Sequence, residues 1–296
     1  MKISADAYPI TVEIPYVLSD VSNLSNPNSL IISGGTILQI NWEAGVEKPV
    51  HLISTEKLQP LKGITETDIN GQRYLKIGAA MTIADCLNNQ LVQRNASILT
   101  EACEKIAAPA VRNRGTIGGN ICSKIGDTIS VLLVLQAQLS FFNGKHEYII
   151  PLREWLVKPH PSSSELLTNI FIPIHVTNIS TYSFFRKIGR RESFTAAIIS
   201  VAGYLEFQDT IIKTARLSIG GGAHLPCRLT ETEKELINGG ETTDWKHLNK
   251  VIQADFSSYT DPFVTEEYRK QVAANLFIAT IKDFLIARER SKSYGS

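Results

Sequence analysis

Over its first half, the chain alternates between short apolar runs and stretches whose apolar residues recur at helical spacing. A short apolar run bounded by turn residues predicts a strand, and a repeat of about 3.6 residues predicts a helix. The predicted strands of this region are 30–33, 50–53 and 74–78. The predicted helices are 83–89, for which Thr82 is a suitable N-cap, and 97–107, which Pro109 should stop.

A short helix or buried segment follows at 129–135, and then a β-hairpin. The hairpin would pair 139–142 with 148–150, because the Asn-Gly dipeptide at 143–144 favours a tight turn between two strands. A further apolar run at 166–172 predicts the last strand before the order of elements changes.

Beyond residue 173 the pattern changes to strands followed by helices. The proline- and serine-rich stretch 158–164 predicts a loop, and 173–181 is the best candidate for a domain linker. The later strands are predicted at 182–186, 198–207 and 214–219, and the helices at 230–238, 243–254 and 265–290. This order predicts an α+β domain with helices on one face of an antiparallel sheet.

Composition and charge narrow the classes of function. Of the 296 residues, 43% are hydrophobic and 20% are charged, which suits a folded protein of one large or two ordinary domains. The net charge of +1 gives no electrostatic reason to expect nucleic acid as the main partner. No stretch approaches the about 20 apolar residues of a membrane span, and the N-terminus lacks the apolar core of a signal peptide. These features predict a cytoplasmic protein without a membrane span.

The four cysteines, Cys86, Cys103, Cys122 and Cys227, form no C-x-x-C pair and no spacing typical of zinc or iron–sulfur ligands. We expect buried or half-buried thiols that bind no metal. Two [2Fe–2S] clusters would need about eight thiolates. Any iron–sulfur cluster that works with this chain should therefore belong to another chain.

Two glycine pairs, at 34–35 and 118–119, stand where an apolar run gives way to small or polar residues. Glycine permits a positive φ and lets backbone N–H groups approach a ligand, and successive N–H groups can hold an anion. The stretches 30–37 and 116–121 around these pairs carry no positive charge, so a phosphate there would depend on backbone N–H groups and on the hydroxyls of Thr36 and Thr116. The simplest alternative is that each pair is only a turn. Neither segment fits the G-x-G-x-x-G or Walker pattern.

Taken together, these segments resemble the flavoprotein subunit of molybdenum hydroxylases, a group that includes bacterial xanthine dehydrogenase and carbon monoxide dehydrogenase. The first segment reads SGGT over 33–36, and the second reads APAVRNRGTIGGNIC over 108–122. The resemblance extends to FR at 185–186, to RRE at 190–192 and to LSIGG at 217–221. It covers nearly the whole chain, in the expected order.

The resemblance implies an α+β protein with a two-lobed FAD-binding domain of the vanillyl-alcohol-oxidase (PCMH) type. That domain would span 1–176, with lobes at roughly 1–55 and 56–176. An α+β C-terminal domain, an antiparallel sheet with helices, would follow at 177–290, and 291–296 would be a flexible tail.

The resemblance also implies that the two glycine segments hold the FAD pyrophosphate between them. The cofactor-binding residues that it implies are Leu30, Ile31, Ile32, Ser33, Gly34, Gly35, Thr36, Ile37, Ile106, Thr116, Ile117, Gly118, Gly119, Asn120, Ser123, Asp127, Leu167 and Arg186. Asp127 would accept hydrogen bonds from cofactor hydroxyls, or else act as the N-cap of the helix that follows it. Leu167 matches a position where the backbone meets the flavin region.

Four departures from the family pattern bear on this site. Arg186 stands where a lysine near the isoalloxazine is usual, which keeps the charge but changes the donor geometry. Ile106 stands at a position for a bulky or aromatic residue and offers no π-stacking. The stretch from Asn120 to Asp127 is shorter than in several relatives, which affects the placement of Ser123 and Asp127. The first glycine segment has no histidine, a residue that commonly attaches FAD in the wider fold, so we expect FAD to bind non-covalently.

By the same resemblance, the chain would be an electron-transfer subunit with no acid–base catalyst of its own. A molybdopterin-binding large subunit would oxidise the organic substrate, xanthine or another purine in the closest case. A small subunit with [2Fe–2S] clusters would relay the electrons, and FAD in this chain would pass them to NAD+.

Other hypotheses stay open at this point. The same subunit could serve carbon monoxide dehydrogenase, a nicotinate or aldehyde hydroxylase, or an aromatic acyl-CoA reductase, because the substrate would bind another chain. A stand-alone FAD oxidase of the same fold is a second alternative, although the sequence offers no obvious substrate base. A cofactor-free assembly module is a third, and the two intact glycine segments argue against it. The basic run formed by Arg186, Lys187, Arg190 and Arg191 could be a partner surface or a flavin neighbour, and for Arg190 and Arg191 a solvated face is the alternative.

Overall fold

The computed structural model describes residues 10–159, 165–175, 179–189, 197–209, 211–240 and 243–293, which form two compact units. Unit 1 takes the described residues of Met1–Ala96, Ala108–Ser123 and Gln136–Ile174. Unit 2 takes Ser97–Ala107, Lys124–Leu135 and the described residues from His175 onward. The chain thus passes repeatedly between the units, and Ala107, Lys124 and Gln136, which lie at these passages, all have positive φ.

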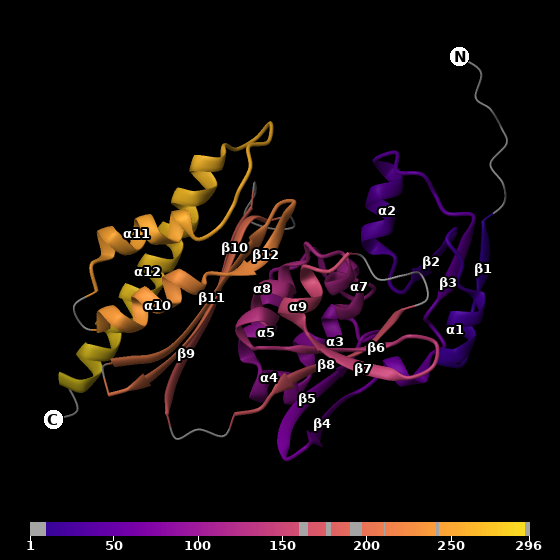
Figure 1. Cartoon of the computed structure of the whole chain (residues 1–296), viewed down its shortest axis with the longest axis horizontal. Helices are drawn as coiled ribbons and strands as arrows, with labels where there is room; N and C mark the ends of the chain where they lie inside the picture. Colours follow the sequence, from indigo (N-terminus) through magenta and orange to yellow (C-terminus); the bar gives the residue numbers. More distant parts are fainter. Residues whose placement is uncertain are drawn as a thin grey trace. The chain divides into compact units, whose positions relative to one another are not determined.

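The first sheet of unit 1 is parallel and small. Its strands lie in the order β1 (Thr11–Glu13), β3 (His51–Ser54) and β2 (Ser29–Ile32). Helix α1 (Leu18–Leu24) connects β1 to β2, and α2 (Thr36–Glu43) lies between β2 and β3 in the sequence, as parallel strands require a crossover (Figure 1). Strand β2 forms one edge of the sheet and is only half-buried along its length, although its sequence is apolar.

The second sheet of unit 1 is antiparallel. Its strands lie in the order β4 (Ile64–Ile69), β5 (Gln72–Gly78), β8 (Leu166–Pro173), β6 (Gln138–Phe142) and β7 (Glu147–Pro151). The central strand β8 is buried at every position but the last, which explains why most of its residues are apolar. The β6–β7 hairpin was predicted, and Gly144 supplies the positive φ of its turn. Strand β4 was not predicted, because its sequence ITETDI is mostly polar.

Short helices complete unit 1. They are η1 (Gln59–Leu61), α3 (Ile83–Asn88), α4 (Gln90–Asn95), α6 (Pro109–Arg112), α7 (Ile117–Cys122) and α9 (Leu152–Leu156). Thr82 caps α3 as predicted, in a capping box in which Thr82 and Asp85 each accept the other's backbone N–H. The prediction that Pro109 stops a helix was wrong, because Pro109 is the first residue of α6, where its missing N–H costs nothing.

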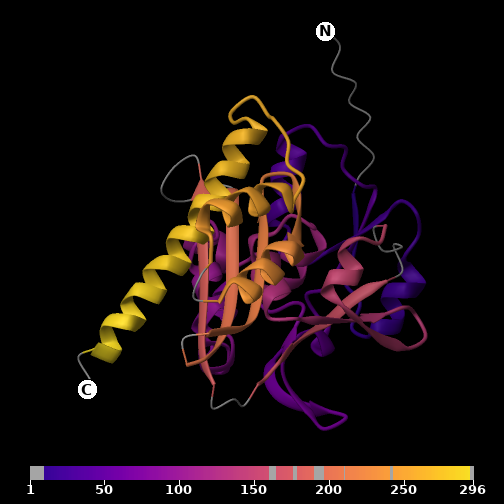
Figure 2. The same cartoon turned by 60° about the vertical axis from the view of Figure 1, so that its left-hand side comes forward.

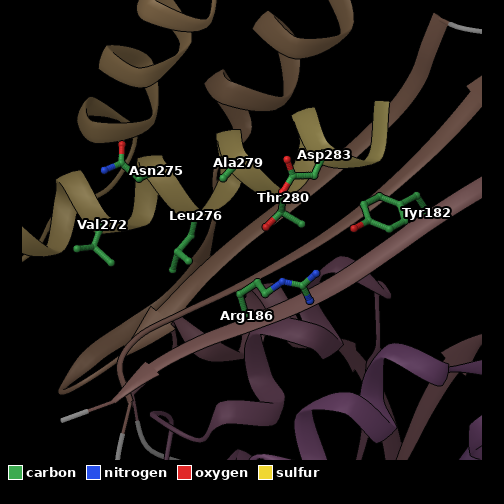
Figure 3. Close-up of a pocket in the computed structure, with 8 residues that line it drawn as sticks. All are labelled: Tyr182, Arg186, Val272, Asn275, Leu276, Ala279, Thr280 and Asp283. Carbon is green, nitrogen blue, oxygen red and sulfur yellow. The ribbon is translucent and has the colours of Figure 1, made fainter. Parts of the chain in front are cut away.

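Unit 2 is built on one long antiparallel sheet. Its strands lie in the order β12 (His224–Arg228), β11 (Ile211–Gly221), β10 (Ala197–Gln208) and β9 (Ser180–Gly189). Side chains alternate between the two faces along a strand. On β9, Tyr182 and Arg186 therefore point toward one face, where they meet helix α12 (Glu266–Ser293), as Figure 3 shows. Phe185 and Lys187 point toward the opposite face.

Helices cover both faces of this sheet. Helices α10 (Thr230–Gly239), α11 (Trp245–Ala254) and α12 lie on one face (Figure 2). Helices α5 (Ser97–Glu104) and α8 (Asp127–Val134) pack on the other face. A Cβ added at Gly220 of β11 would lie 2.6 Å from Ser130 Oγ of α8, so the contact is close. The prediction of helices on one face was therefore incomplete, because the second layer comes from the N-terminal half of the sequence.

The face under α10–α12 carries an extended apolar core. Phe184 and Phe207 of the sheet and Phe277 of α12 are at most 2% exposed. Tyr182 stacks on Phe284 with ring centroids 3.8 Å apart, which extends this core toward the end of α12. Burying one such side chain contributes roughly 1.5–3 kcal/mol, so the apolar core is the main attachment of these helices.

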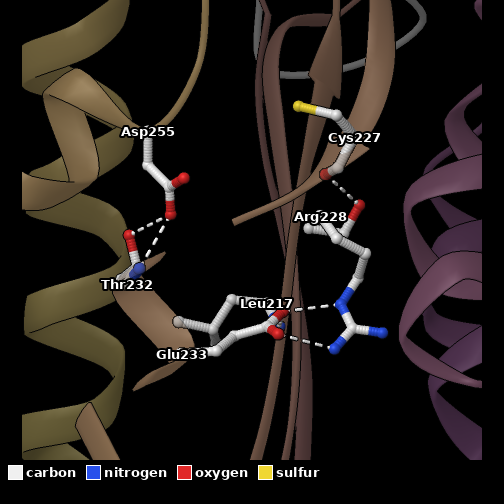
Figure 4. Close-up of polar contacts among 7 residues, drawn as sticks. Leu217, Cys227, Arg228, Thr232, Glu233 and Asp255 are labelled. Atoms are coloured by element: carbon white, nitrogen blue, oxygen red, sulfur yellow. Dashed lines mark hydrogen bonds and ion pairs between the residues drawn. The ribbon is translucent and has the colours of Figure 1, made fainter. Parts of the chain in front are cut away.

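A buried carboxylate also fixes α10 to the sheet (Figure 4). Glu233 Oε1 accepts hydrogen bonds from the backbone N–H of Leu217, at 2.8 Å, and from Arg228 Nε, at 2.6 Å. Glu233 Oε2 accepts a second bond from Arg228 Nη2 at 2.7 Å. Asp255, after α11, accepts from the backbone and hydroxyl of Thr232 at 2.8 Å. These carboxylates therefore join α10, α11 and the β11–β12 pair.

Some predictions fall outside the described residues. These are Arg190, Arg191 and Glu192, most of the predicted loop 158–164 and parts of the linker 173–181. Helix α12 continues to Ser293, into the predicted tail 291–296, whose last residues are not described. The division into domains at residue 176 and lobes at residue 55 stays a prediction. The packing adds that 97–107 and 124–135 belong with the C-terminal residues.

We expect Glu233→Ala to lower the free energy of unfolding by about 3–5 kcal/mol, because it leaves Arg228 and a buried N–H without their acceptor. Urea unfolding followed by circular dichroism measures the change. Glu231→Ala is the matched control, since Glu231 lies on the same helix and its pair with Lys234 is mostly exposed. Equal losses in the two variants would contradict a special role for Glu233.

Candidate functional site

A cleft of about 350 Å³ lies within unit 1, at the end of strand β2. It brings together residues from three separate predicted segments: Leu30, Ile31 and Ser33 from the first glycine segment, Gly118 and Gly119 from the second, and Leu167 from β8. They are far apart in the sequence, and the two sheets of unit 1 hold them together. The size is within the range of sites for small ligands, about 300–1,000 Å³.

The first glycine segment offers unpaired backbone donors. Gly35 has φ +70°, a left-handed conformation that suits glycine, and it is the N-cap of α2 without a side-chain hydrogen bond. The backbone N–H groups of Ser33, Gly34, Gly35 and Thr36 find no acceptor in the part of the chain that the structure describes. N–H groups at an uncapped helix N-terminus attract anions, so this segment can hold a phosphate.

The second glycine segment is a helix and not a loop. Thr116 is the N-cap of α7, and its Oγ1 accepts from Gly119 N at 3.1 Å. Ile117 N donates to Met81 O and Gly118 N to Ala79 O, both at 2.9 Å, and Asn120 N donates to Thr116 O at 2.9 Å. The expectation that these N–H groups form an anion-binding nest was therefore wrong, because neighbouring backbone oxygens and the cap already use them.

Glycine in these segments serves close packing of the backbone more than ligand approach. A Cβ at Gly34 would lie 1.9 Å from Arg114 O, and one at Gly118 would lie 2.6 Å from Ala79 O. Gly119 differs, because its Cβ would meet only Thr116 Oγ1, at 3.0 Å. Gly119 also lines the cleft, so a larger side chain there would enter the cleft and would meet a side-chain oxygen rather than a backbone atom.

The remaining predicted residues of unit 1 lie around these segments. Thr36 and Ile37 begin α2, and Ile32 ends β2. A Cβ at Gly115 would lie 3.2 Å from Thr36 Oγ1, so Thr36 packs against the turn before α7. Ser123 is the C-cap of α7, and its hydroxyl donates to Asn120 O at 2.7 Å.

Several residues of the cleft were missed by the sequence analysis. These are Ser29, Thr55, Leu61, Cys122, Glu165 and Leu166, together with Ala79 and Ala80. No local pattern marks them, because they lie at ends of different strands and helices. Cys122 is exposed, which corrects the expectation that every cysteine is at least half-buried.

Three predicted residues, Ile106, Asp127 and Arg186, lie in unit 2. Asp127 is the first residue of α8, whose N-cap is Gly126, so the N-cap alternative for Asp127 was wrong. Asp127 Oδ2 instead accepts from Lys187 Nζ at 2.7 Å, in an ion pair with side chains 15% and 8% exposed. Lys187 Nζ also donates to Lys105 O at 3.0 Å, next to Ile106. Lys187 belongs to the basic run predicted as a partner surface or flavin neighbour, but its pairing with Asp127 was not predicted.

Arg186 lies on the opposite face of the sheet from this ion pair. Its Nη1 donates to Phe185 O at 2.9 Å, and its side chain lines a cavity of about 380 Å³ between β9 and α12 (Figure 3). Tyr182, Thr280 and Asp283 line the same cavity. Burial raises the pKa of Tyr182, so its hydroxyl stays protonated beside the guanidinium. Lys187, and not Arg186, is the cation beside Asp127.

The structure shows no sign of a metal site or a membrane span in its described ranges. No group of three or more His, Cys, Asp or Glu side chains there is arranged to hold a metal ion. No helix among those residues is both long and apolar enough to cross a membrane.

Comparison with protein families shows to which family the chain belongs. A family model described as "FAD binding domain in molybdopterin dehydrogenase" matches residues 10–175, more than half of the chain. The chain belongs to this family. A second model, "CO dehydrogenase flavoprotein C-terminal domain", matches residues 183–284 of this flavoprotein. The predicted family and the FAD cofactor are thereby confirmed, and the protein is an oxidoreductase subunit.

The names of individual relatives are consistent with this family, but they refer to different substrates. The flavoprotein is 26% identical over 229 residues to the xanthine dehydrogenase FAD-binding subunit of Escherichia coli O157:H7, covering 75% of this chain and 77% of that protein. It is 30% identical over 245 residues to the 6-hydroxypseudooxynicotine dehydrogenase complex subunit alpha of Paenarthrobacter nicotinovorans, covering 80% of each. A chain of carbon monoxide dehydrogenase from Hydrogenophaga pseudoflava shares the fold, with a TM-score of 0.84 at 20% identity over 92% of this chain and 95% of that chain.

The cleft of unit 1 suits FAD by its own chemistry. The free N–H groups at 33–36 suit a pyrophosphate, and the half-buried Leu30 and Ile31 offer an apolar surface for a ring system. Thr55 is 4% exposed, and its Oγ1 has no hydrogen-bond partner in the described chain, so a ligand group there would satisfy it.

We expect iodoacetamide to label Cys122 first in the native flavoprotein, because Cys122 is exposed while Cys86 and Cys103 are 0% exposed. Cys227 should react only as the pH approaches its pKa, which burial and Asp255 raise to about 11, because the thiolate is the reactive form. Peptide mass spectrometry after timed labelling at pH 8 and pH 10 measures both rates. Labelling of Cys86 as fast as Cys122 would contradict this packing.

Proposed function

We propose that this chain is the FAD-carrying electron-transfer subunit of a xanthine or purine dehydrogenase of the molybdenum hydroxylase type. The supporting observation is the cleft of unit 1, with unpaired N–H groups at 33–36 beside apolar walls, in a chain whose family binds FAD. The partners would be a molybdopterin-binding large subunit and a small subunit with [2Fe–2S] clusters. NAD+ would be the final electron acceptor.

In this proposal the protein binds and orients FAD, and the bound FAD would supply the exchange of one and two electrons. The N–H groups of the first glycine segment bind the pyrophosphate. Leu30, Ile31 and Leu167 exclude water from the cofactor. Helix α7 forms one wall at Gly119 and does not bind the phosphates through its first N–H groups.

Asp127 keeps its proposed role as an acceptor for cofactor hydroxyls, since one of its oxygens bonds to Lys187 and carboxylates accept several bonds. We add Lys187 as its partner, because the ion pair holds the carboxylate in one orientation. The roles of Ile106, Ser123 and Arg186 at the cofactor stay predictions. No side chain is proposed as an acid–base catalyst.

The relatives carry names of xanthine, nicotine and carbon monoxide enzymes, so alternative complexes differ from the proposed one in their substrate. The alternative is the same electron-transfer role in carbon monoxide dehydrogenase, a nicotinate or aldehyde hydroxylase, or an aromatic acyl-CoA reductase. A stand-alone FAD oxidoreductase is a second alternative.

The first test concerns the cofactor. The purified chain, incubated with FAD and freed of excess, should show flavin absorption bands, and Gly119→Leu should lose them because the larger side chain fills the cleft. Ala254→Leu, a similar enlargement at an exposed site of α11, should retain them. FAD should also slow alkylation of Cys122, which lines the cleft. A chain that never binds flavin, even with partner subunits co-expressed, would refute the proposal.

The second test concerns the substrate and the acceptor. A complex isolated through a tag on this chain should show bleaching of its flavin when xanthine is added without oxygen, and recovery when NAD+ follows. Flavin reduction by nicotinate or carbon monoxide, and not by xanthine, would instead support one of the alternative complexes. If a substrate reduces the flavin of the isolated chain without partner subunits, the result would support the stand-alone oxidoreductase.

A further inference from the structure

Two polar side chains in the cleft of unit 1 are not explained by phosphate binding. Glu165, just before β8, and Thr55, just after β3, both line the cleft. Thr55 is buried, and its Oγ1 has no hydrogen-bond partner among the described residues. A buried hydroxyl that stays unpaired is unfavourable, so this atom marks a place where a ligand should donate or accept a hydrogen bond.

Glu165 is held in place by a tyrosine. Tyr148 of β7 donates its hydroxyl hydrogen to Glu165 Oε1 at 2.9 Å. Burial and the neighbouring carboxylate raise the pKa of Tyr148 to about 12, so Tyr148 remains a donor at neutral pH. One carboxylate oxygen is thereby used, and the other, Oε2, has no donor in the described chain.

The charge of Glu165 is not balanced within the cleft. No lysine, arginine or histidine is among the described residues that line it. An ionised carboxylate with a free oxygen accepts hydrogen bonds and disfavours nearby negative charge. The ligand group at Glu165 should therefore be a neutral donor, and neither a phosphate nor a ring that becomes anionic on reduction.

The two halves of FAD differ in this respect. The adenosine half carries an amine and ribose hydroxyls, which are neutral donors and do not change charge during electron transfer. The isoalloxazine half gains negative charge on its N1 and O2 side when it is reduced, and a carboxylate there would oppose reduction. The apolar walls at Leu61 and Leu166 suit a flat base as well.

We propose that Glu165, oriented by Tyr148, and Thr55 bind the adenosine half of the cofactor and so select FAD over FMN. This inference rests on the proposed function, since it requires that the chain hold FAD. It assigns recognition of the adenosine to the side of the cleft formed by β3 and β8, while the first glycine segment recognises the phosphates.

The test compares ADP, FMN and FAD as probes of the full-length chain freed of cofactor, by titration calorimetry. ADP carries the adenosine and the pyrophosphate without the flavin, so it should bind the wild type and compete with FAD. Glu165→Gln should weaken ADP and FAD by about tenfold to a hundredfold, since hydrogen bonds to a charged group are lost or reduced, and leave FMN unchanged. Thr55→Val and Tyr148→Phe should act in the same direction, with smaller changes.

Glu147→Gln is the matched control, because Glu147 is an exposed carboxylate adjacent to Tyr148 on the same strand. Circular dichroism melts of every variant show whether it folds like the wild type. If Glu165→Gln and Thr55→Val leave ADP binding unchanged, or weaken FMN as much as FAD, the adenosine assignment is overturned while FAD binding stands. A wild type that binds none of the three probes would overturn both this assignment and the proposed function.

Discussion

The cleft of unit 1 depends on two places where the backbone approaches another backbone too closely for any side chain. Gly34 lies against the Arg114 carbonyl, and Gly118 lies against the Ala79 carbonyl. The first contact fixes the end of β2 against the turn that leads into α7, and the second fixes α7 against the end of β5. Since β2 and β5 belong to different sheets, these contacts determine how the first glycine segment faces α7 across the cleft.

The same constraint gives the two glycine segments different roles. Because α7 is held by hydrogen bonds from Ile117 and Gly118 to the carbonyls of Met81 and Ala79, which follow β5, its first N–H groups are not available to a ligand. The first N–H groups of helix α2, by contrast, have no acceptor among the residues that the structure describes. The two glycine segments, although similar in sequence, thus differ in role. The second segment forms a fixed wall of the cleft, and the first offers N–H donors for an anion.

Local signals in the sequence predicted the elements well, and tertiary partners decided the rest. Thr82 was recognised as a cap and the Asn-Gly turn as a hairpin, because both depend only on neighbouring residues. The helical state of α7 was not predicted, since it depends on oxygens of Met81 and Ala79. Glu165 was missed for a similar reason, since its partner Tyr148 lies on another strand. Whether Arg186 or Lys187 meets Asp127 depends on the register of β9, which motif matching does not resolve.

The packing of helices α5 and α8 on the sheet of unit 2 has a consequence for how the gene can evolve. They cover one face of the unit 2 sheet, yet their sequences lie within the stretch 10–175 that the FAD-binding family model matches. Recombination between two such genes at the junction of the two matched segments would place helices from one parent on a sheet from the other. The residues at positions 130 and 220, which are in close contact, would then come from different parents and would fit each other only by chance. Lineages of this flavoprotein should therefore inherit the two segments together, as one unit of descent.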